Sequence, residues 1–103
     1  MKYIYLIYSE NGFYKIGITK NLTKRLKTLQ TGNAECLHLV DSFKSDYAST
    51  IEAALHRKYK QYRVNGEWFN IKIDLKAECL QYENNLNYIK ENNTYDINRK
   101  YNR

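Results

Sequence analysis

Apolar and polar residues alternate along the first twenty positions in a way that predicts a β-hairpin. Residues 3–8 are mostly β-branched and aromatic, which favours a strand, and residues 13–19 resume this pattern. Residues 9–12 between them are polar and turn-forming. The chain is therefore expected to open with two antiparallel strands joined by a short turn.

Three later segments have the apolar spacing of amphipathic helices. Asn21 can cap the first, over about residues 22–30, and Gly32 is predicted to take the left-handed conformation beyond its end. Ser45 or Asp46 can cap the second, which runs to about residue 62, and Asp74 can cap the third, which runs to about residue 91. The expected buried positions are Leu22, Leu26 and Leu29, then Ile51, Leu55 and Tyr62, then Leu75, Cys79, Tyr82, Leu86 and Ile89.

Two further segments have strand character. Residues 36–43 alternate as a third strand, and residues 67–71 are short and aromatic, as expected of an edge strand after a turn at 64–66. The order predicts an α+β domain, a small antiparallel sheet of about three strands flanked by helices. Residues 93–103 are polar and basic, so we expect a folded domain over residues 1–92 and a flexible tail over residues 93–103.

Charge and composition narrow the class of partner. The 103 residues suffice for one domain, and the net charge of +6 points to a polyanion such as nucleic acid. The 11 tyrosines can fill a core or stack on bases, and most fall on periodic apolar positions, which favours the core.

The chain shows no signal peptide and no run of 18 apolar residues. We therefore expect a cytoplasmic protein, or one in the nucleoid or a host interior, with no membrane partner. Cys36 and Cys79 lie far apart, match no metal-ligand spacing, and are interpreted as reduced core residues.

Glu52 and Arg25 have side chains that suit cleavage of a phosphodiester. That reaction needs a water nucleophile, neutralisation of charge at phosphorus and help for the leaving oxygen. Glu52 lies mid-helix beside the apolar Ile51, and a carboxylate there can hold a hard divalent cation. Arg25 flanks the predicted leucine stripe, and its fork can bind phosphate through two nitrogens. The alternative for each is a solvated charge on a helix face.

Tyr5, Lys15 and His56 are candidates for activating the water. A phenol has an ordinary pKa near ~10, so Tyr5 is a poor base unless a cation lowers that pKa. Lys15, on the neighbouring strand, is predicted to be that cation. His56 lies four residues after Glu52 on the same helix face, so it is a candidate acid, base or metal ligand. A core tyrosine, an exposed lysine and a packing histidine are the alternatives.

Gly17 and three lysines complete the predicted nucleic-acid surface. Gly17 permits close approach of the backbone to a neighbour or to phosphate, with relief of strand twist as the alternative. Lys20, Lys24 and Lys27 surround the arginine and would attract a phosphate backbone by charge alone.

Four other residues have structural interpretations. His38 has no predicted partner, and Glu67 is expected to form an ion pair with a nearby lysine or arginine. Trp68 and Phe69 are more readily placed in the core than against bases.

Taken together, these motifs resemble the GIY-YIG nucleases. Ile-Tyr at residues 4–5 and Lys-Ile-Gly at residues 15–17 are similar to the paired strand motifs of that family's phage and viral subgroup. Arg25, Glu52 within Glu-Ala-Ala-Leu-His, and Gly-Glu-Trp-Phe at residues 66–69 continue the match. The resemblance covers about residues 2–72 and implies a GIY-YIG-like fold in which the glutamate binds metal and the histidine after it takes part.

The chain departs from the broader family at two positions. Most members have a tyrosine where this chain has Lys15 and a glycine where it has Tyr3. The subgroup shares the lysine, so the group that activates water stays open between Tyr5 helped by Lys15 and Tyr5 helped by His56.

The predicted function is a divalent-metal-dependent endonuclease that hydrolyses DNA by a one-metal mechanism. Glu52 would hold Mg²⁺ or Mn²⁺, and Arg25 would clamp the phosphate. A domain this small binds only a short stretch, so strong sequence specificity would need a homodimer or another DNA-binding protein.

Three alternatives stay open. The domain could bind nucleic acid with little catalysis, which the missing second tyrosine favours slightly. It could bind another protein through its tyrosines and its Trp-Phe pair. A metal-independent enzyme with His56 as nucleophile is the third, and its activity would survive chelation.

Overall fold

A five-stranded antiparallel sheet and three α-helices make up the domain. The structure, a computed structural model, describes residues 1–101, with side chains through Glu91. The strand order in the sheet is β3-β1-β2-β5-β4. The elements are β1 (Lys2–Ser9), β2 (Tyr14–Thr19), α1 (Leu22–Thr31), β3 (Leu37–Ser45), α2 (Ala48–Lys58), a 3₁₀ turn (Lys60–Tyr62), β4 (Arg63–Asn65), β5 (Trp68–Phe69) and α3 (Leu75–Tyr101).

The α+β class is confirmed, but the predicted count of about three strands is wrong. β4 and β5 are three and two residues long, too short for an alternating pattern to reveal them. β5 was expected at an edge, whereas it lies between β2 and β4. The segment 64–66, predicted as a turn, contributes its first two residues to β4.

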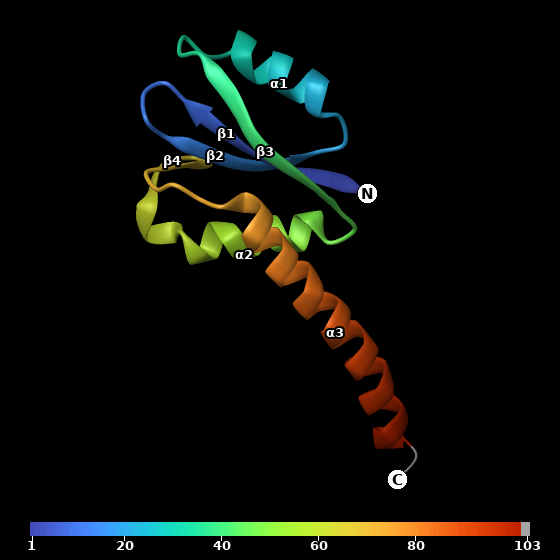
Figure 1. The fold of residues 1–103 in the computed structure, drawn as a ribbon. Helices are drawn as coiled ribbons and strands as arrows, with labels where there is room; N and C mark the ends of the chain where they lie inside the picture. Colours follow the sequence, from blue (N-terminus) through green and yellow to red (C-terminus); the bar gives the residue numbers. More distant parts are fainter. Residues whose placement is uncertain (102–103) are drawn as a thin grey trace.

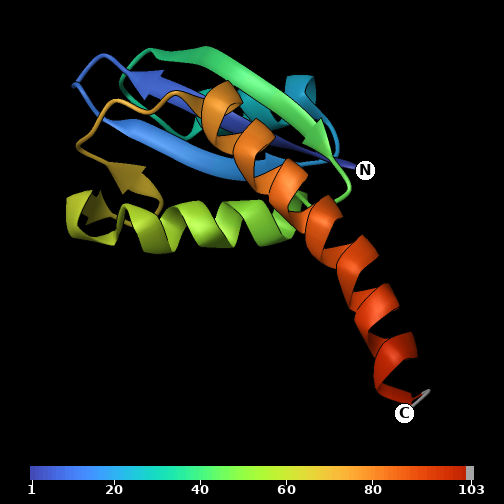
Figure 2. The same ribbon diagram turned by 60° about the horizontal axis from the view of Figure 1, so that its bottom comes forward.

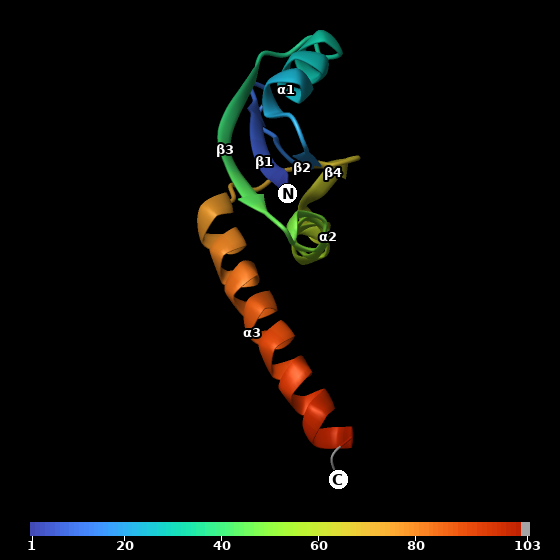
Figure 3. The same ribbon diagram turned by 90° about the vertical axis from the view of Figure 1, so that its right-hand side faces the viewer.

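Helices cover both faces of the sheet (Figures 1 and 3). β1 is an interior strand, between β3 and β2, and its residues alternate between the two faces. Ile4 and Leu6 join the main core with Ile51 and Leu55 of α2, while Tyr5 turns to the side of α1. Figure 2 shows α2, in yellow-green, running along the core face. β1 is thus buried on both sides, which fixes the strand that carries Tyr5.

The predicted N-terminal capping residue is confirmed for two of the three α-helices. Asn21 accepts a hydrogen bond from the Lys24 amide at 3.1 Å, and Asp74 accepts one from the Ala77 amide at 3.2 Å. The third prediction is wrong, because Tyr47 precedes α2 and Ser45 ends β3 instead. The Ser45 hydroxyl accepts the Tyr47 amide at 3.0 Å, so it supports the turn into the helix from two positions before the N-cap residue, Tyr47.

Several finer predictions need correction. Gly32 has φ −86°, an ordinary right-handed value, because its amide closes the last turn of α1 onto Thr28 and Gln30. The leucines of α1 are half-buried rather than buried, since this helix covers the margin of its face. α2 ends at Lys58, and Tyr62 lies exposed in the 3₁₀ turn that follows. Cys36 is exposed, whereas Cys79 is buried as expected.

α3 leans away from the sheet and gives the molecule its longest dimension, 61 Å (Figures 1 and 3). Its backbone continues ten residues past the predicted end at 91, because no glycine or proline after Gly66 interrupts it. The side chains of residues 92–101 and all of residues 102–103 lie outside the described part. The division of the chain at residue 92 therefore stays a prediction.

None of the helices in the described residues is both long enough and apolar enough to cross a membrane.

Candidate active site at the open edge of strand β2

The site forms where β5 stops pairing with β2. The ladder between them joins Tyr14 to Phe69 and Lys15 to Trp68, and the Ile16 amide then donates to the Glu67 carbonyl at 3.4 Å. Beyond this point, the edge of β2 has no further strand partner in the described sheet. The Ile16 carbonyl instead accepts a hydrogen bond from Nε2 of His56, on α2, at 2.9 Å. Because a carbonyl can only accept, Nε2 carries the proton of this bond, and Nδ1 is the ring nitrogen left for another partner.

Tyr5 reaches this edge across Gly17. The two residues are paired directly between β1 and β2. A Cβ built on Gly17 would lie 2.2 Å from Oη of Tyr5 and 2.4 Å from its Cζ, so the phenol lies directly against the glycine. Gly17 is itself buried, and Tyr5 is only 1% exposed. The glycine therefore permits the close approach expected of it, and the neighbour is the Tyr5 ring.

Arg25 of α1 holds the Tyr5 hydroxyl. Its Nε donates to Oη at 3.3 Å, in a half-buried setting. Burial raises the pKa of Tyr5 above its ordinary value, the hydrogen bond and charge of Arg25 oppose this, and Glu67 and Glu52 add to the rise. Tyr5 is thus a neutral phenol near neutral pH. Since Arg25 supplies the donor, the phenol keeps its own proton to donate elsewhere.

Lys15 does not take the part predicted for it beside Tyr5. Its Nζ pairs with Glu67 Oε2 at 3.0 Å and lies 5.4 Å from the centre of the Trp68 ring. The side chain is 10% exposed, so it is not an exposed strand lysine either. The expected ion pair of Glu67 is confirmed. The cation beside Tyr5 is Arg25, because β5 places Glu67 next to Lys15 and draws its ammonium away.

Two carboxylates and an imidazole converge beside these groups. One donor atom from each of Glu52, His56 and Glu67 lies within 4.8 Å of the others. Burial is the main cause of a raised Glu52 pKa; Glu67 raises it further, while His56, Lys15 and Lys2 lower it. A raised carboxyl pKa marks a site where negative charge is under-compensated. Such a donor set suits a divalent cation that accepts both oxygen and imidazole ligands, Mn²⁺ among them.

Glu67 was missed as a candidate ligand. Sequence alone gave it an ion pair only, yet it stands directly before the aromatic pair that forms β5. Pairing of that segment with β2 places residue 67 opposite Ile16, next to His56. The position of Glu67 before the Trp-Phe pair was visible in the sequence. Its place beside His56 could be predicted only with the register between β5 and β2.

The predicted lysines gather beside Arg25, not around the acids. Arg25 shares a surface pocket of about 270 Å³ at the start of α1 with Thr19, Lys20, Asn21, Lys24 and Thr28. Lys27 is exposed one turn farther along the helix. The first turn of α1 carries no acid, so its positive end is left for an anion.

The structure therefore brings most of the predicted site residues together. Tyr5 is in direct contact with both Gly17 and Arg25, and the acids couple electrostatically to its phenol. The pocket beside α1 contains Arg25 but neither Tyr5 nor Glu52, so the site within the described residues has two parts. One part is basic, and the other is an acidic donor cluster.

Substituting Gly17 with alanine should displace the Tyr5 ring. A methyl group cannot lie 2.2 Å from a phenol oxygen, so either the ring or β2 must move. We expect the unfolding free energy to fall by about 1–3 kcal/mol, the range for overpacking a buried site. Urea denaturation would measure the change.

Gly32→Ala is the matched control. A Cβ there meets nothing closer than 3.8 Å, and the backbone angle is ordinary. It should leave stability unchanged or raise it by up to about 1 kcal/mol. Equal stabilities for Gly17→Ala and wild type would show that the close packing of Tyr5 is not required.

Comparison with protein families matches residues 2–84 to the T5orf172 domain. This finding overturns the GIY-YIG assignment made from sequence. The motifs behind that assignment are one to five residues long, and two of them, Ile-Tyr and Lys-Ile-Gly, correspond to the packing of Tyr5 against Gly17 on paired strands.

Two similar proteins come from Invertebrate iridescent virus 6. "Uncharacterized protein 460R" is 29% identical over 82 residues, which cover 77% of this chain and 37% of that protein. "Putative KilA-N domain-containing protein 315L" is 29% identical over 96 residues, which cover 84% of this chain and 41% of that protein. The chain thus spans about two fifths of the length of these relatives. No solved structure matches.

Proposed function

The chain belongs to the T5orf172 domain family, and from its site geometry we propose that it is a divalent-metal-dependent phosphodiesterase that acts on DNA. The observation that carries the proposal is the meeting, at one open sheet edge, of a phenol–guanidinium pair with a cluster of two carboxylates and an imidazole. The first pair suits a phosphate, and the cluster suits a cation. Phosphodiester hydrolysis needs both.

The basic part would hold the substrate. Arg25 already fixes its Nε on Tyr5, which leaves its terminal nitrogens to engage phosphate oxygens. Lys20 and Lys24 line the same pocket at the start of α1. These contacts read charge and not bases, so binding should be strongly salt-dependent.

The acidic part would hold the cation. Glu52 and Glu67 supply carboxylate oxygens, and His56 supplies Nδ1, because its Nε2 is held by the Ile16 carbonyl. A bound divalent cation would neutralise phosphate charge and stabilise the leaving oxygen. Its presence would also favour the charged form of Glu52, whose pKa is raised mainly by burial and further by Glu67.

Tyr5 would position rather than deprotonate the nucleophile. With its pKa raised, the phenol stays protonated and can donate a hydrogen bond to a phosphate oxygen or orient a water. Lys15, paired with Glu67, would hold that carboxylate in place. In this proposal His56 both supports the sheet edge and serves the cation cluster.

A cleavage assay tests the proposal. Labelled single- and double-stranded DNA would be incubated with the protein in EDTA, in Mg²⁺ and in Mn²⁺, at two salt concentrations. We expect cleavage only with a divalent cation, and weaker binding at higher salt in every lane.

Three other outcomes would overturn the proposal. Tight, salt-dependent binding without cleavage in any cation would identify a nucleic-acid-binding module instead. Absence of DNA binding at low salt would favour a protein-binding domain. Cleavage that survives EDTA would exclude the metal and point to His56 as a nucleophile.

A further inference from the structure

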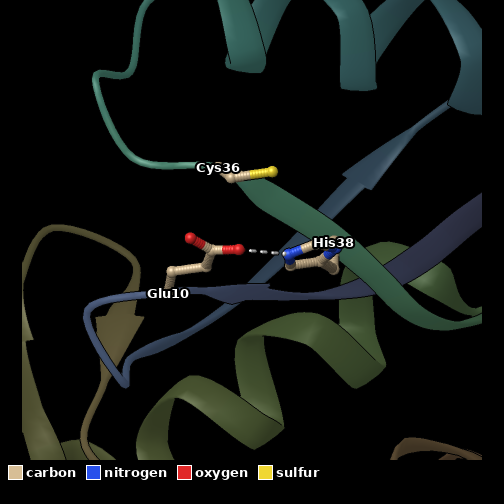
Figure 4. A group of neighbouring side chains, drawn as sticks. All are labelled: Glu10, Cys36 and His38. Atoms are coloured by element: carbon tan, nitrogen blue, oxygen red, sulfur yellow. Dashed lines mark hydrogen bonds and ion pairs between the residues drawn. The ribbon is translucent and has the colours of Figure 1, made fainter.

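A second group of side chains that could hold a metal ion lies where β1 ends and β3 begins. Tyr8 pairs with His38 and Ser9 with Leu37, and the Glu10 amide then donates to the Cys36 carbonyl at 3.3 Å. Opposed residues in an antiparallel pair share a face, and residues two apart on one strand do as well. The register therefore places Glu10, Cys36 and His38 on one side of the sheet (Figure 4).

These three side chains are already close. Glu10 Oε1 lies 3.2 Å from His38 Nε2, and one donor atom from each of Glu10, Cys36 and His38 lies within 4.8 Å of the others. All three are exposed, so their side chains can adjust. The sequence prediction that His38 has no partner is wrong, because its Nε2 lies within hydrogen-bond distance of Glu10. That prediction failed because Glu10 belongs to the β1–β2 turn, 28 residues away from His38 in the chain.

From this geometry we propose that Glu10, Cys36 and His38 form a surface site for a soft transition-metal ion of the Zn²⁺ class. A thiolate and an imidazole select such ions, whereas Mg²⁺ and Ca²⁺ prefer oxygen ligands alone. Three protein ligands leave the fourth tetrahedral position to water. The ion would replace the hydrogen bond between Glu10 and His38, and the Cys36 thiol would release its proton to solvent as the metal–sulfur bond forms.

The site is independent of the proposed active site. It uses neither Glu52, His56 nor Glu67, and it differs in chemistry because it contains a thiol. The other cysteine cannot substitute, since Cys79 is buried and burial raises its thiol pKa to about 12. Binding would join the β1–β2 turn to the first residues of β3, an edge strand. It should therefore stabilise that corner of the sheet.

Metal titration of the full chain tests this site. The Glu52→Gln variant serves as background, so that a carboxylate of the other cluster is removed. Under reducing conditions, we expect about one Co²⁺ to bind with thiolate charge-transfer absorption, and Zn²⁺ to displace it and raise Tm. Cys36→Ser and His38→Asn should each lower Zn²⁺ affinity at least ~10-fold, and Cys36→Ser should abolish the absorption band.

Glu35→Gln is the matched control, because it removes an exposed carboxylate beside Cys36 that lies outside the cluster. Its Zn²⁺ affinity should equal that of the background. Binding without a thiolate band, equal Zn²⁺ affinity in Cys36→Ser, or no Zn²⁺ binding would each overturn the proposal. DNA cleavage is not a readout here, so the two proposals fail separately.

Discussion

Glu52→Gln should abolish DNA cleavage and, at neutral pH, make the fold more stable. The amide keeps the shape of the side chain but loses the charge that would hold a cation, so we expect a rate loss of ~100-fold or more. Stability should rise because burial and Glu67 raise the pKa of the Glu52 carboxyl, which shows that its charged form is unfavourable in the fold. Cleavage assays and thermal melts across pH would measure the two effects.

The pH dependence follows from the direction of that shift. A raised folded-state pKa means that the folded protein binds the Glu52 proton more tightly than the unfolded chain does. The resulting stabilisation is present below the ordinary carboxyl pKa of ~4.3 and is lost as pH rises through the folded-state value. Glu52→Gln should thus have a higher Tm than wild type at neutral pH. This difference should shrink as the pH falls through the folded-state pKa of Glu52 toward the ordinary carboxyl pKa.

Two comparisons make this result diagnostic. Asp46→Asn removes an exposed negative charge just before α2 and should change neither Tm nor cleavage appreciably. Mn²⁺ should raise the Tm of wild type more than that of Glu52→Gln. A variant that loses stability at neutral pH, or that cleaves as fast as wild type, would contradict the proposed site.

Arg25→Ala should reduce cleavage by about 10²–10³-fold, or about 2.7–4 kcal/mol of barrier, the range for losing a donor aimed at developing charge. The loss should be this large because Arg25 has two contacts to lose. It would bind phosphate, and its Nε also orients the Tyr5 hydroxyl at 3.3 Å. Single-turnover cleavage at saturating protein would separate this effect from weaker DNA binding.

The neighbouring lysine supplies the control. Lys24→Ala removes one exposed positive charge from the same pocket. It should weaken binding and lower the slope of affinity against salt by about one, with little effect on the single-turnover rate. Arg25→Lys keeps the charge but loses the fork and the Nε contact, so it should resemble alanine in rate. Full activity in Arg25→Lys would leave only a charge requirement.

The sequence predicted the parts of the fold that span a full pattern of apolar positions. The β1–β2 hairpin, α1, β3 and the start of α3 follow from alternation, helical spacing and the Asn21 and Asp74 caps. The sequence did not predict β4 and β5 correctly, because strands of three and two residues have too few positions to show an alternating pattern. β5 is one of these, and it decides where the site forms.

The sequence predicted most residues of the candidate site but not which of their side chains contact one another. Tyr5, Arg25 and Glu52 were singled out from their chemistry, and the structure places the first two in contact. The partner of Lys15 and the position of Glu67 depend on the β2–β5 register, which short motifs do not encode. The family assignment failed for a related reason, because short motifs reflect local packing and do not by themselves identify a family.

His56 illustrates what an unfinished ladder does to chemistry. Where another strand would have donated an amide to the Ile16 carbonyl, an imidazole nitrogen donates instead. The ring is thereby held in one tautomer and orientation by the main chain, with Phe69 packed edge-on at 5.0 Å between ring centres. If β5 were longer by two residues, its backbone would pair with β2 and take the Ile16 carbonyl from His56. The short length of β5 is therefore what allows the main chain to hold this imidazole at the site.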